Sequence, residues 1–338
     1  MSKVQRVNIS NSCRLIKRQL SSVSSQSPLM SNPFSIENTH KIRESSSKFN
    51  KPNFISFDAF DTLYTPKEPV PLQYHKIAYE QFGIDKPLAS IEQEFPNIYK
   101  QLLKEFPNYG KSSQEIVSTA DWWSELIIRL FNLKRGDEIT QTICNRLLDH
   151  FSGPEAYKVY QDVIPTLTKL NLLGIKLVIS SNSDERIRQV LESLGLMKFF
   201  SKDDIYLSYE LETGKPAKQF FDKVSTTVHY DIKGETFKTD KLKAEYLEDC
   251  WHIGDNYTED FLGAVRSGWN GILLDREYKS PFFASTNKNH KPYYDGCFTE
   301  KSIEDTTRND DFSIIANNRV VITRMSQLLE LFEFNPSQ

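Results

Sequence analysis

The sequence predicts an α/β protein in which helices sandwich a parallel β-sheet, with an all-helical domain inserted after the first strand. Short apolar runs alternate along the chain with segments whose apolar residues recur at helical spacing. This alternation is the pattern of a parallel sheet whose strands are joined by helices. It is interrupted once, because residues 66–160 are helical in pattern throughout. The sheet domain is therefore expected to comprise residues 51–65 and 161–338.

The first predicted strand, FISF at residues 54–57, leads directly into the inserted block. Ligands of parallel α/β sheets bind beyond the carboxyl ends of the strands, so an insertion at this point is interpreted as a cap over those ends. Four stretches of the block place apolar residues three or four positions apart, as amphipathic helices do. We expect these helices at residues 74–84, 91–106, 120–133 and 138–151.

Strand and helix patterns alternate again after residue 160 and complete the sheet domain. Gly195 follows one of these helical stretches and suits a left-handed C-cap. Further strands are expected at residues 176–181, 204–208, 250–254 and 271–275. Helices are expected at residues 163–175, 184–196, 217–224 and 258–268, and residues 319–334 read as a strand followed by an amphipathic helix.

Two polar segments interrupt this second half. Residues 233–249 are rich in charge and are expected to form a solvated connection between a helix and a strand. Residues 276–317 contain Asn, Asp, Lys and Thr throughout and are expected to form a polar loop excursion on the surface.

Composition indicates a globular protein with a substantial core. The 338 residues are 38% hydrophobic and 26% charged, and the net charge of −3 gives no electrostatic reason to expect a nucleic-acid partner. The four cysteines form no CxxC pair, so neither a zinc site nor a disulfide framework is indicated. No apolar run approaches the roughly 20 residues of a transmembrane helix. Nothing in the sequence indicates a protein partner.

The first 50 residues differ from the rest. Residues 1–36 carry five basic residues and many serines but no acidic residue. This composition is typical of a mitochondrial targeting sequence and favours a mitochondrial location. The alternative is a disordered tail of a cytoplasmic or nuclear protein. Residues 37–50 are interpreted as a linker, so that the folded part begins near Lys51.

Polar side chains follow four of the predicted strands. Because the carboxyl ends of parallel strands meet at one edge of a sheet, we expect these side chains to lie together although they span some 200 positions. Each could alone be an ordinary turn or cap residue, but all of them in this order are difficult to explain as coincidence. They are Asp58, Ser181, Asn182, Lys215, Asp255, Asn256 and Asp260.

This set of side chains suits phosphoryl transfer. A carboxylate such as Asp58 can attack phosphorus and form an acyl phosphate. Asp58 and Asp255 offer the oxygen ligands that Mg²⁺ prefers. Ser181 would donate a hydrogen bond to a phosphoryl oxygen, and Lys215 would supply positive charge to the transition state.

These motifs resemble those of the haloacid dehalogenase (HAD) superfamily. They read FDAFDTLY, VISSNSDER, GKP and HIGDNYTED here, and the resemblance covers about residues 52–275. SNSDERIRQVLESLGL, HIGDNYTEDFLGAVRSG and FPNYG followed by WW look like the HAD-like hydrolase domain-containing-3 subgroup. The resemblance implies a three-layer Rossmann-like sheet and a helical cap at residues 66–160.

The same resemblance assigns roles to the site residues. The catalytic residues are Asp58, Ser181 and Lys215, and Thr62 and Asn182 are expected to bind a small phosphorylated metabolite. The expected Mg²⁺ ligands are Asp58, the backbone carbonyl of Phe60, Asp255 and Asp260.

One position departs from the family pattern. HAD phosphatases usually carry a second aspartate, as general acid and base, two residues after the nucleophile, and this chain has Phe60 there. Asp61 takes the place of the usual glycine and is expected to brace the turn rather than to transfer protons. True haloacid dehalogenases, which attack carbon without a metal, also have an aromatic residue at the position of Phe60. In a dehalogenase, however, the metal-binding acids Asp255 and Asp260 would have no purpose.

Three functions therefore remain open. The first is a weak or specialised Mg²⁺-dependent phosphatase acting through an aspartyl phosphate on Asp58, restricted to good leaving groups. The second is a catalytically impaired HAD scaffold that acts by binding, because Phe60 cannot transfer a proton. The third is a dehalogenase.

Overall fold

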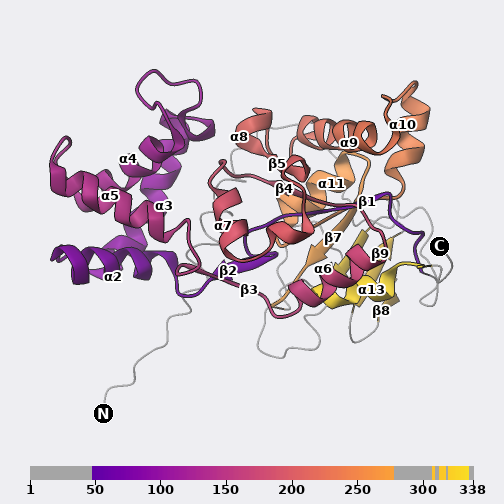
Figure 1. The fold of residues 1–338 in the computed structure, drawn as a ribbon, viewed down its shortest axis with the longest axis horizontal. Coiled ribbons are helices and arrows are strands. Elements are labelled where there is room, and N and C mark those ends of the chain that lie inside the picture. The colour runs from indigo at the N-terminus through magenta and orange to yellow at the C-terminus, as the bar shows by residue number, and fades with distance from the viewer. Residues whose placement is uncertain (1–47, 278–306, 309–311, 317–318, 335–338) are drawn as a thin grey trace, which may run out of the picture. The chain divides into compact units, whose positions relative to one another are not determined.

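The computed structural model describes residues 48–277, 307–308, 312–316 and 319–334, and these fall into two compact units (Figure 1). The helical unit comprises residues 66–158 with residues 183–195, and the sheet unit comprises the other described residues. The expected targeting segment and most of the expected excursion at 276–317 lie outside the described residues. Among the described residues, no helix is both long and apolar enough to cross a bilayer.

The sheet unit is built on one mostly parallel sheet, which confirms the predicted α/β class. Its strand order is β5-β4-β1-β6-β7-β10-β9-β8, and the first six strands run parallel while β9 and β8 are antiparallel additions. The strands are β1 (Phe54–Phe57), β4 (Leu177–Ser181), β5 (Ile205–Leu207), β6 (Cys250–Gly254), β7 (Asn270–Leu274), β8 (Thr307–Arg308), β9 (Phe312–Ala316) and β10 (Arg319–Ile322).

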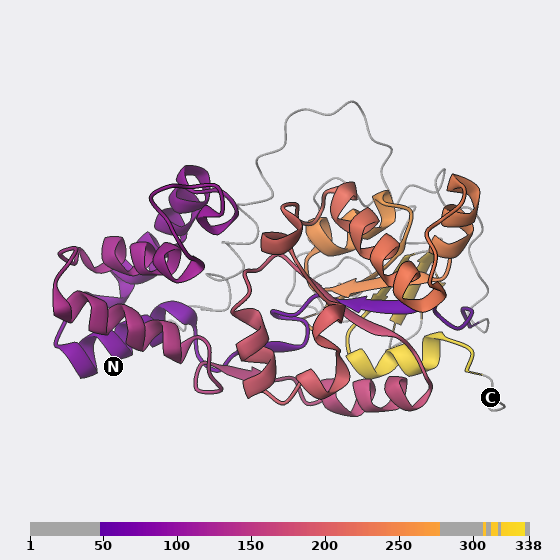
Figure 2. The same ribbon diagram turned by 45° about the horizontal axis from the view of Figure 1, so that its top comes forward.

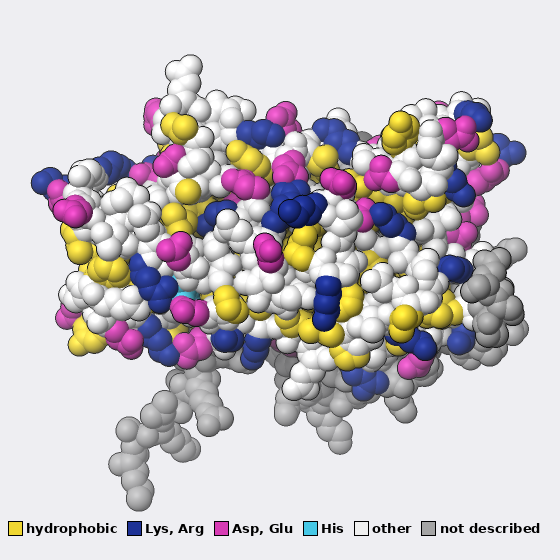
Figure 3. Space-filling view, viewed as in Figure 1, with side chains coloured by type: hydrophobic (Ala, Val, Ile, Leu, Met, Phe, Trp, Pro, Cys, Tyr) yellow, Lys and Arg dark blue, Asp and Glu magenta, His cyan; other side chains and the backbone are white. Residues whose placement is uncertain are grey.

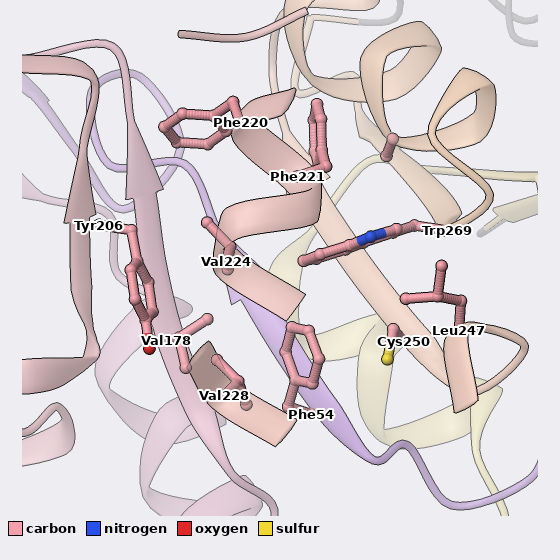
Figure 4. Packing of buried hydrophobic residues seen from close by; sticks show 11 residues of the cluster. Phe54, Val178, Tyr206, Phe220, Phe221, Val224, Val228, Leu247, Cys250 and Trp269 are labelled. Atoms are coloured by element: carbon pink, nitrogen blue, oxygen red, sulfur yellow. The ribbon is translucent and has the colours of Figure 1, made fainter. Parts of the chain in front are cut away.

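One face of this sheet is covered by α9 (Lys218–Lys233), α10 (Asp240–Leu247) and α11 (Gly263–Arg266). Figure 4 shows side chains from β1, β4, β5 and β6 meeting those of α9 and Trp269 in one buried cluster. The Trp269 ring lies edge-on to Phe54 and Phe221, with ring centroids 5.0 and 5.3 Å apart. Such aromatic packing buries a large apolar area against this face of the sheet, beside the first residues of β1 and β6.

The opposite face carries α6 (Val163–Leu172) and α13 (Leu328–Leu331), which lie side by side under the sheet (Figure 2). There Trp251 packs against Phe49 and Phe332 at centroid distances of 4.7 and 5.2 Å. Because side chains alternate along a strand, the next residue of β6, His252, points to the α9 face, where it meets Phe221. The buried Phe49 pairs with Phe332, so the folded part includes a residue two positions before the expected Lys51.

The helical unit contains the four helices expected from the periodicity. They are α2 (Val70–Phe82), α3 (Leu88–Glu105), α4 (Thr119–Phe131) and α5 (Glu138–His150), each packed on the next or on α2. Trp122 of α4 is fully buried and touches Tyr99 and Tyr109, so it belongs to the core of this unit. Residues 183–195, which include α7 (Ile187–Ser193), group with these helices. That this unit covers the strand ends stays a prediction.

The other elements among the described residues are short. Strands β2 (Tyr64–Pro66) and β3 (Tyr157–Val159) form a separate two-stranded sheet at the two ends of the helical block, which is therefore not entirely helical. The remaining helices are short: η2 (Asn108–Gly110), η3 (Met197–Phe199), η4 (Lys202–Asp204), α8 (Ser208–Leu211), η5 (Tyr257–Leu262) and η6 (Met325–Gln327).

Several segments differ from the expected pattern. The charged connection 233–249 contains helix α10, and the expected helix at 258–268 begins as a π-helix, η5, before it continues as α11. Part of the expected loop excursion forms β8 and β9. Basic and acidic side chains are interspersed across the face shown in Figure 3.

Replacing Phe221 with alanine should lower the free energy of unfolding by about 3–5 kcal/mol, because the substitution opens a cavity beside Trp269 and His252. Leu172→Ala is the matched control, since this leucine is 79% exposed, and its effect should stay within about 0.5 kcal/mol. Urea unfolding followed by circular dichroism measures both. Equal losses in the two variants would contradict the described core.

Candidate active site

The carboxyl edge of the parallel sheet brings the predicted site residues together. Asp58 directly follows β1, Ser181 ends β4, and Asp255 follows β6. Neighbouring parallel strands fix these positions, since β1 lies between β4 and β6. The Asp58 amide donates a hydrogen bond to the Ile253 carbonyl at 2.8 Å, which ties the turn after β1 to the end of β6.

Lys215 connects two of the carboxylates. Its Nζ donates hydrogen bonds to Asp58 Oδ1 at 2.8 Å and to Asp260 Oδ1 at 2.5 Å, and its side chain is 1% exposed. Burial alone would lower the pKa of this lysine, but the charges of Asp260 and Asp58 outweigh burial and raise the pKa above its ordinary value. Lys215 is therefore a permanent cation between two acidic groups.

Asn182 holds the backbone of Lys215. The Lys215 amide donates to Asn182 Oδ1, and Asn182 Nδ2 donates to the Lys215 carbonyl, both at 2.8 Å. Gly214 leaves room for this amide, because a Cβ at that position would come within 2.7 Å of Asn182 Oδ1. The structure thus gives Asn182 a role in positioning Lys215, while its contact with substrate stays a prediction.

Thr62 and Asp255 lie together. The Asp255 amide donates to Thr62 Oγ1 at 3.2 Å, and that hydroxyl lies 3.5 Å from Asp255 Oδ1. Arg276 holds the same loop: its guanidinium donates to the Thr62 carbonyl at 3.2 Å and to both carboxylate oxygens of Asp162 at 2.9–3.0 Å. It also stacks on Tyr160 at 3.9 Å. The structure thereby explains how Thr62 is fixed, and its contact with substrate stays a prediction.

The carboxylate of Asp260 is anchored on both oxygens. The Asn256 amide donates to Oδ2 at 2.9 Å, while Lys215 and His252 contact Oδ1. The carboxylate also packs against Gly254, where any Cβ would collide with it. The π-helix η5 begins with Asn256 as its N-cap and delivers Asp260 to this position.

His252 is completely buried beside this carboxylate. Its Nε2 lies 3.1 Å from Asp260 Oδ1, and its Nδ1 lies 2.9 Å from Ser56 Oγ. Burial lowers the pKa of the imidazole, an effect that the hydrogen bond to Asp260 only partly offsets. Both ring nitrogens of this buried histidine therefore have a hydrogen-bonding neighbour.

Comparison with known proteins decides the family. The family model described as "haloacid dehalogenase-like hydrolase" matches residues 53–268, which is well over half of the chain. The chain belongs to the haloacid dehalogenase-like hydrolase family. This match spans all of the predicted site residues, from Asp58 to Asp260.

Two individual relatives and one solved structure are similar to this chain. The chain is 34% identical to the uncharacterized protein YMR130W of Saccharomyces cerevisiae over 83% of this chain and 93% of that protein. It is 28% identical to haloacid dehalogenase-like hydrolase domain-containing protein 3 of Danio rerio over 66% of this chain and 85% of that protein, a relative that bears the name of the subgroup that the motifs resemble. A solved structure of a 2-haloacid dehalogenase from Pseudomonas syringae is 18% identical to this chain and has a TM-score of 0.49. The similarity covers 84% of this chain and 98% of that one.

The HAD site offers a set of oxygen ligands suited to a hard divalent cation. One carboxylate oxygen from each of Asp58, Asp255 and Asp260 lies within 4.8 Å of the other two. Carboxylate oxygens are the ligands that Mg²⁺ prefers in proteins, so the residues present fit the cofactor. The backbone carbonyl of Phe60 as a further ligand stays a prediction.

The two residues that depart from the HAD pattern have structural partners. The Phe60 ring packs edge-on against Tyr64 at 5.9 Å. Asp61 has a left-handed φ of 59°, which explains why a glycine usually occupies this place, and its carboxylate accepts a hydrogen bond from Thr65 at 2.8 Å. Asp61 therefore braces the turn, as expected.

The sequence did not reveal every residue that shapes the site. Glu259 lies 3.3 Å from Asn182, and Arg276 donates to the Thr62 carbonyl, yet no role was predicted for either. Signals were present, because Glu259 stands in the HIGDNYTED motif and Arg276 directly follows the predicted strand at 271–275. The pairing of His252 with Asp260 was also missed. A signal existed there, because His252 and Gly254 are two residues apart in the strand that leads to Asp255 and therefore lie on the same face of the sheet.

Replacing Gly254 with alanine should displace the Asp260 carboxylate, because the added Cβ would occupy its place. We expect affinity for Mg²⁺ to fall by about tenfold or more. The rise in the thermal unfolding midpoint on addition of Mg²⁺ measures this loss.

Gly153→Ala serves as the matched control, because a Cβ there meets only ordinary contacts, the nearest being the Asp149 carbonyl at 3.4 Å. An unchanged Mg²⁺ response in folded Gly254→Ala protein would contradict the described packing.

Proposed function

We propose that this HAD-family hydrolase is a Mg²⁺-dependent phosphatase that acts through an aspartyl phosphate on Asp58. The observation that carries the proposal is the buried bridge in which Lys215 holds Asp58 and Asp260 beside Asp255. It combines a nucleophile, a fixed cation and a cluster of oxygen ligands, which are the three elements that transfer of a phosphoryl group requires.

The chain's own residues support two successive displacements. In the first, an oxygen of Asp58 attacks phosphorus and forms a new O–P bond. The bond between phosphorus and the leaving oxygen breaks, and its electron pair stays on that oxygen. In the second, a water oxygen attacks the same phosphorus, the bond to Asp58 breaks, and inorganic phosphate and the Asp58 carboxylate are released, with the water proton passing to phosphate or solvent.

Positive charge and hydrogen-bond donors stabilise the phosphoryl oxygens during both steps. Lys215 holds a permanent positive charge 2.8 Å from Asp58, and Ser181 at the end of β4 would donate a hydrogen bond to the phosphoryl group. Mg²⁺ bound by Asp58, Asp255 and Asp260 would neutralise further negative charge at this group. Small phosphorylated metabolites are the substrate class that suits these groups.

The leaving group decides which substrates react well. A phenyl ring at position 60 cannot donate a proton, and a positioned acid typically contributes 10²–10⁴ in rate. Its neighbour Asp61 is engaged with Thr65. Acyl phosphates, whose leaving group is already a stable carboxylate, therefore need the missing proton least.

Asp58→Asn should abolish Mg²⁺-dependent release of phosphate from acetyl phosphate and from p-nitrophenyl phosphate, because an amide does not attack phosphorus. The loss should exceed about 1,000-fold, as removal of a nucleophile typically does. Colorimetric detection of phosphate at matched protein concentrations measures it. Wild-type protein without turnover on either compound would overturn the proposed activity and favour a binding role.

Phe60→Asp should restore a proton donor. We expect hydrolysis of glycerol phosphate, which has a poor leaving group, to rise by at least about 100-fold. Hydrolysis of acetyl phosphate should change little, because its leaving group needs no protonation. The ratio of kcat/KM for the two compounds measures this effect, with Phe60→Asn as a control of similar size that cannot donate a carboxylic proton. Equal gains on both compounds would contradict the assignment.

A further inference from the structure

A line of buried polar groups leads from the interior of the sheet to the Asp260 carboxylate. Ser180 of β4, Ser56 of β1 and His252 of β6 lie on adjacent strands. The two serine hydroxyls are 2.8 Å apart, Ser56 Oγ is 2.9 Å from His252 Nδ1, and His252 Nε2 is 3.1 Å from Asp260 Oδ1. All of these side chains are at most 2% exposed. None of the three groups behind Asp260 has a step in the proposed reaction.

The chemistry of these groups fixes the orientation of the histidine ring. An ionised carboxylate can only accept, so the Nε2 of His252 carries a proton and donates to Asp260. The Nδ1 of the same ring lies against the Ser56 hydroxyl, which is itself hydrogen-bonded to Ser180. Ser56 and Ser180 therefore hold the ring with its Nε2 turned toward Asp260.

This orientation completes the fixation of Asp260. Lys215 contacts only Oδ1, and the Asn256 amide contacts only Oδ2. Lys215 is also shared with Asp58, so its hydrogen bond alone does not determine how the Asp260 carboxylate is turned. The His252 contact comes from β6, a strand in the middle of the sheet, and gives Oδ1 a second partner that is not shared with Asp58.

We propose that His252, oriented by Ser56 and Ser180, is a positioning residue that holds Asp260 in the conformation that binds a divalent cation. This inference rests on the cation site of the proposed function. Hydrogen bonds to ligating carboxylates from groups behind them typically change metal affinity by 10- to 100-fold. His252 acts through Asp260 and does not itself contact substrate or cation.

Three variants of one position separate orientation from simple filling of space. In His252→Gln the side-chain amide can reach the place of Nε2 and donate to Asp260. In His252→Asn the shorter amide reaches only the place of Nδ1, near Ser56. His252→Phe fills the volume but offers no hydrogen bond. We expect the Gln variant to keep affinity for Mg²⁺ within about threefold, and the Asn and Phe variants to lose about tenfold or more.

The measurement is a titration of the full-length protein with Mg²⁺ alone by isothermal calorimetry, without any phosphorylated compound. Circular dichroism and the unfolding midpoint establish that each variant is folded. Since a merely structural histidine would be replaced equally well or equally badly by Asn and Gln, the difference between these two variants is the decisive readout.

Ser56→Ala provides a milder test if the histidine variants do not fold. It removes the hydroxyl that holds the Nδ1 edge of the histidine ring, and Mg²⁺ affinity should fall by about threefold or more. Ser225→Ala is the matched control, because this buried hydroxyl contacts only backbone carbonyls of its own helix. It should leave affinity unchanged.

A failure of the role of His252 can be distinguished from a failure of the cation site itself. Wild-type protein that does not bind Mg²⁺ would overturn the site and with it the proposed function. Wild-type protein that binds Mg²⁺, with equal affinity in the folded Phe, Asn and Gln variants or in Ser56→Ala, would overturn the role of His252 and leave the proposed function standing.

Discussion

The ion bridge that Lys215 forms with Asp58 and Asp260 is the interaction on which the rest of the site depends. Two buried carboxylates repel each other, and a buried lysine without a partner would lose its charge. Together the three groups satisfy one another, with Nζ distances of 2.8 and 2.5 Å. Breaking one member would leave an uncompensated buried charge, which typically costs about 3–5 kcal/mol.

The surrounding fold maintains that bridge from several directions. Asn182 clamps the backbone of Lys215, and the neighbouring Gly214 leaves room for its amide. The strand β6 contributes Gly254, which makes space for Asp260, and His252, which contacts it. Parallel strands bring these groups together without long loops, because β1 lies between β4 and β6. A site whose supports come from rigid strands keeps its geometry better than one built on loops alone.

Much of this arrangement is readable from the sequence, because its signals are local. The apolar strands and the four helices of the inserted block follow from periodicity, and Asp58 and Asp255 follow from their places after FISF and CWHIG. Other features depend on partners far away in the chain. Arg276 pairs with Asp162 across 114 positions, and nothing near either residue indicates the other. Helix α10 was missed because the charges of its segment outweighed a weak apolar pattern, and the π-helix η5 was missed because it has the composition of an ordinary helix.

The central claim is that Asp58 becomes phosphorylated. It is tested most directly by mixing the protein with Mg²⁺ and acetyl phosphate, quenching in acid within milliseconds, and mapping the covalent adduct by mass spectrometry. The account predicts one phosphoryl group on the peptide that contains FISFDAFD, located at Asp58 and absent from Asp58→Asn protein. Phosphate release without any adduct at Asp58, or an adduct on another residue that persists in Asp58→Asn protein, would contradict it.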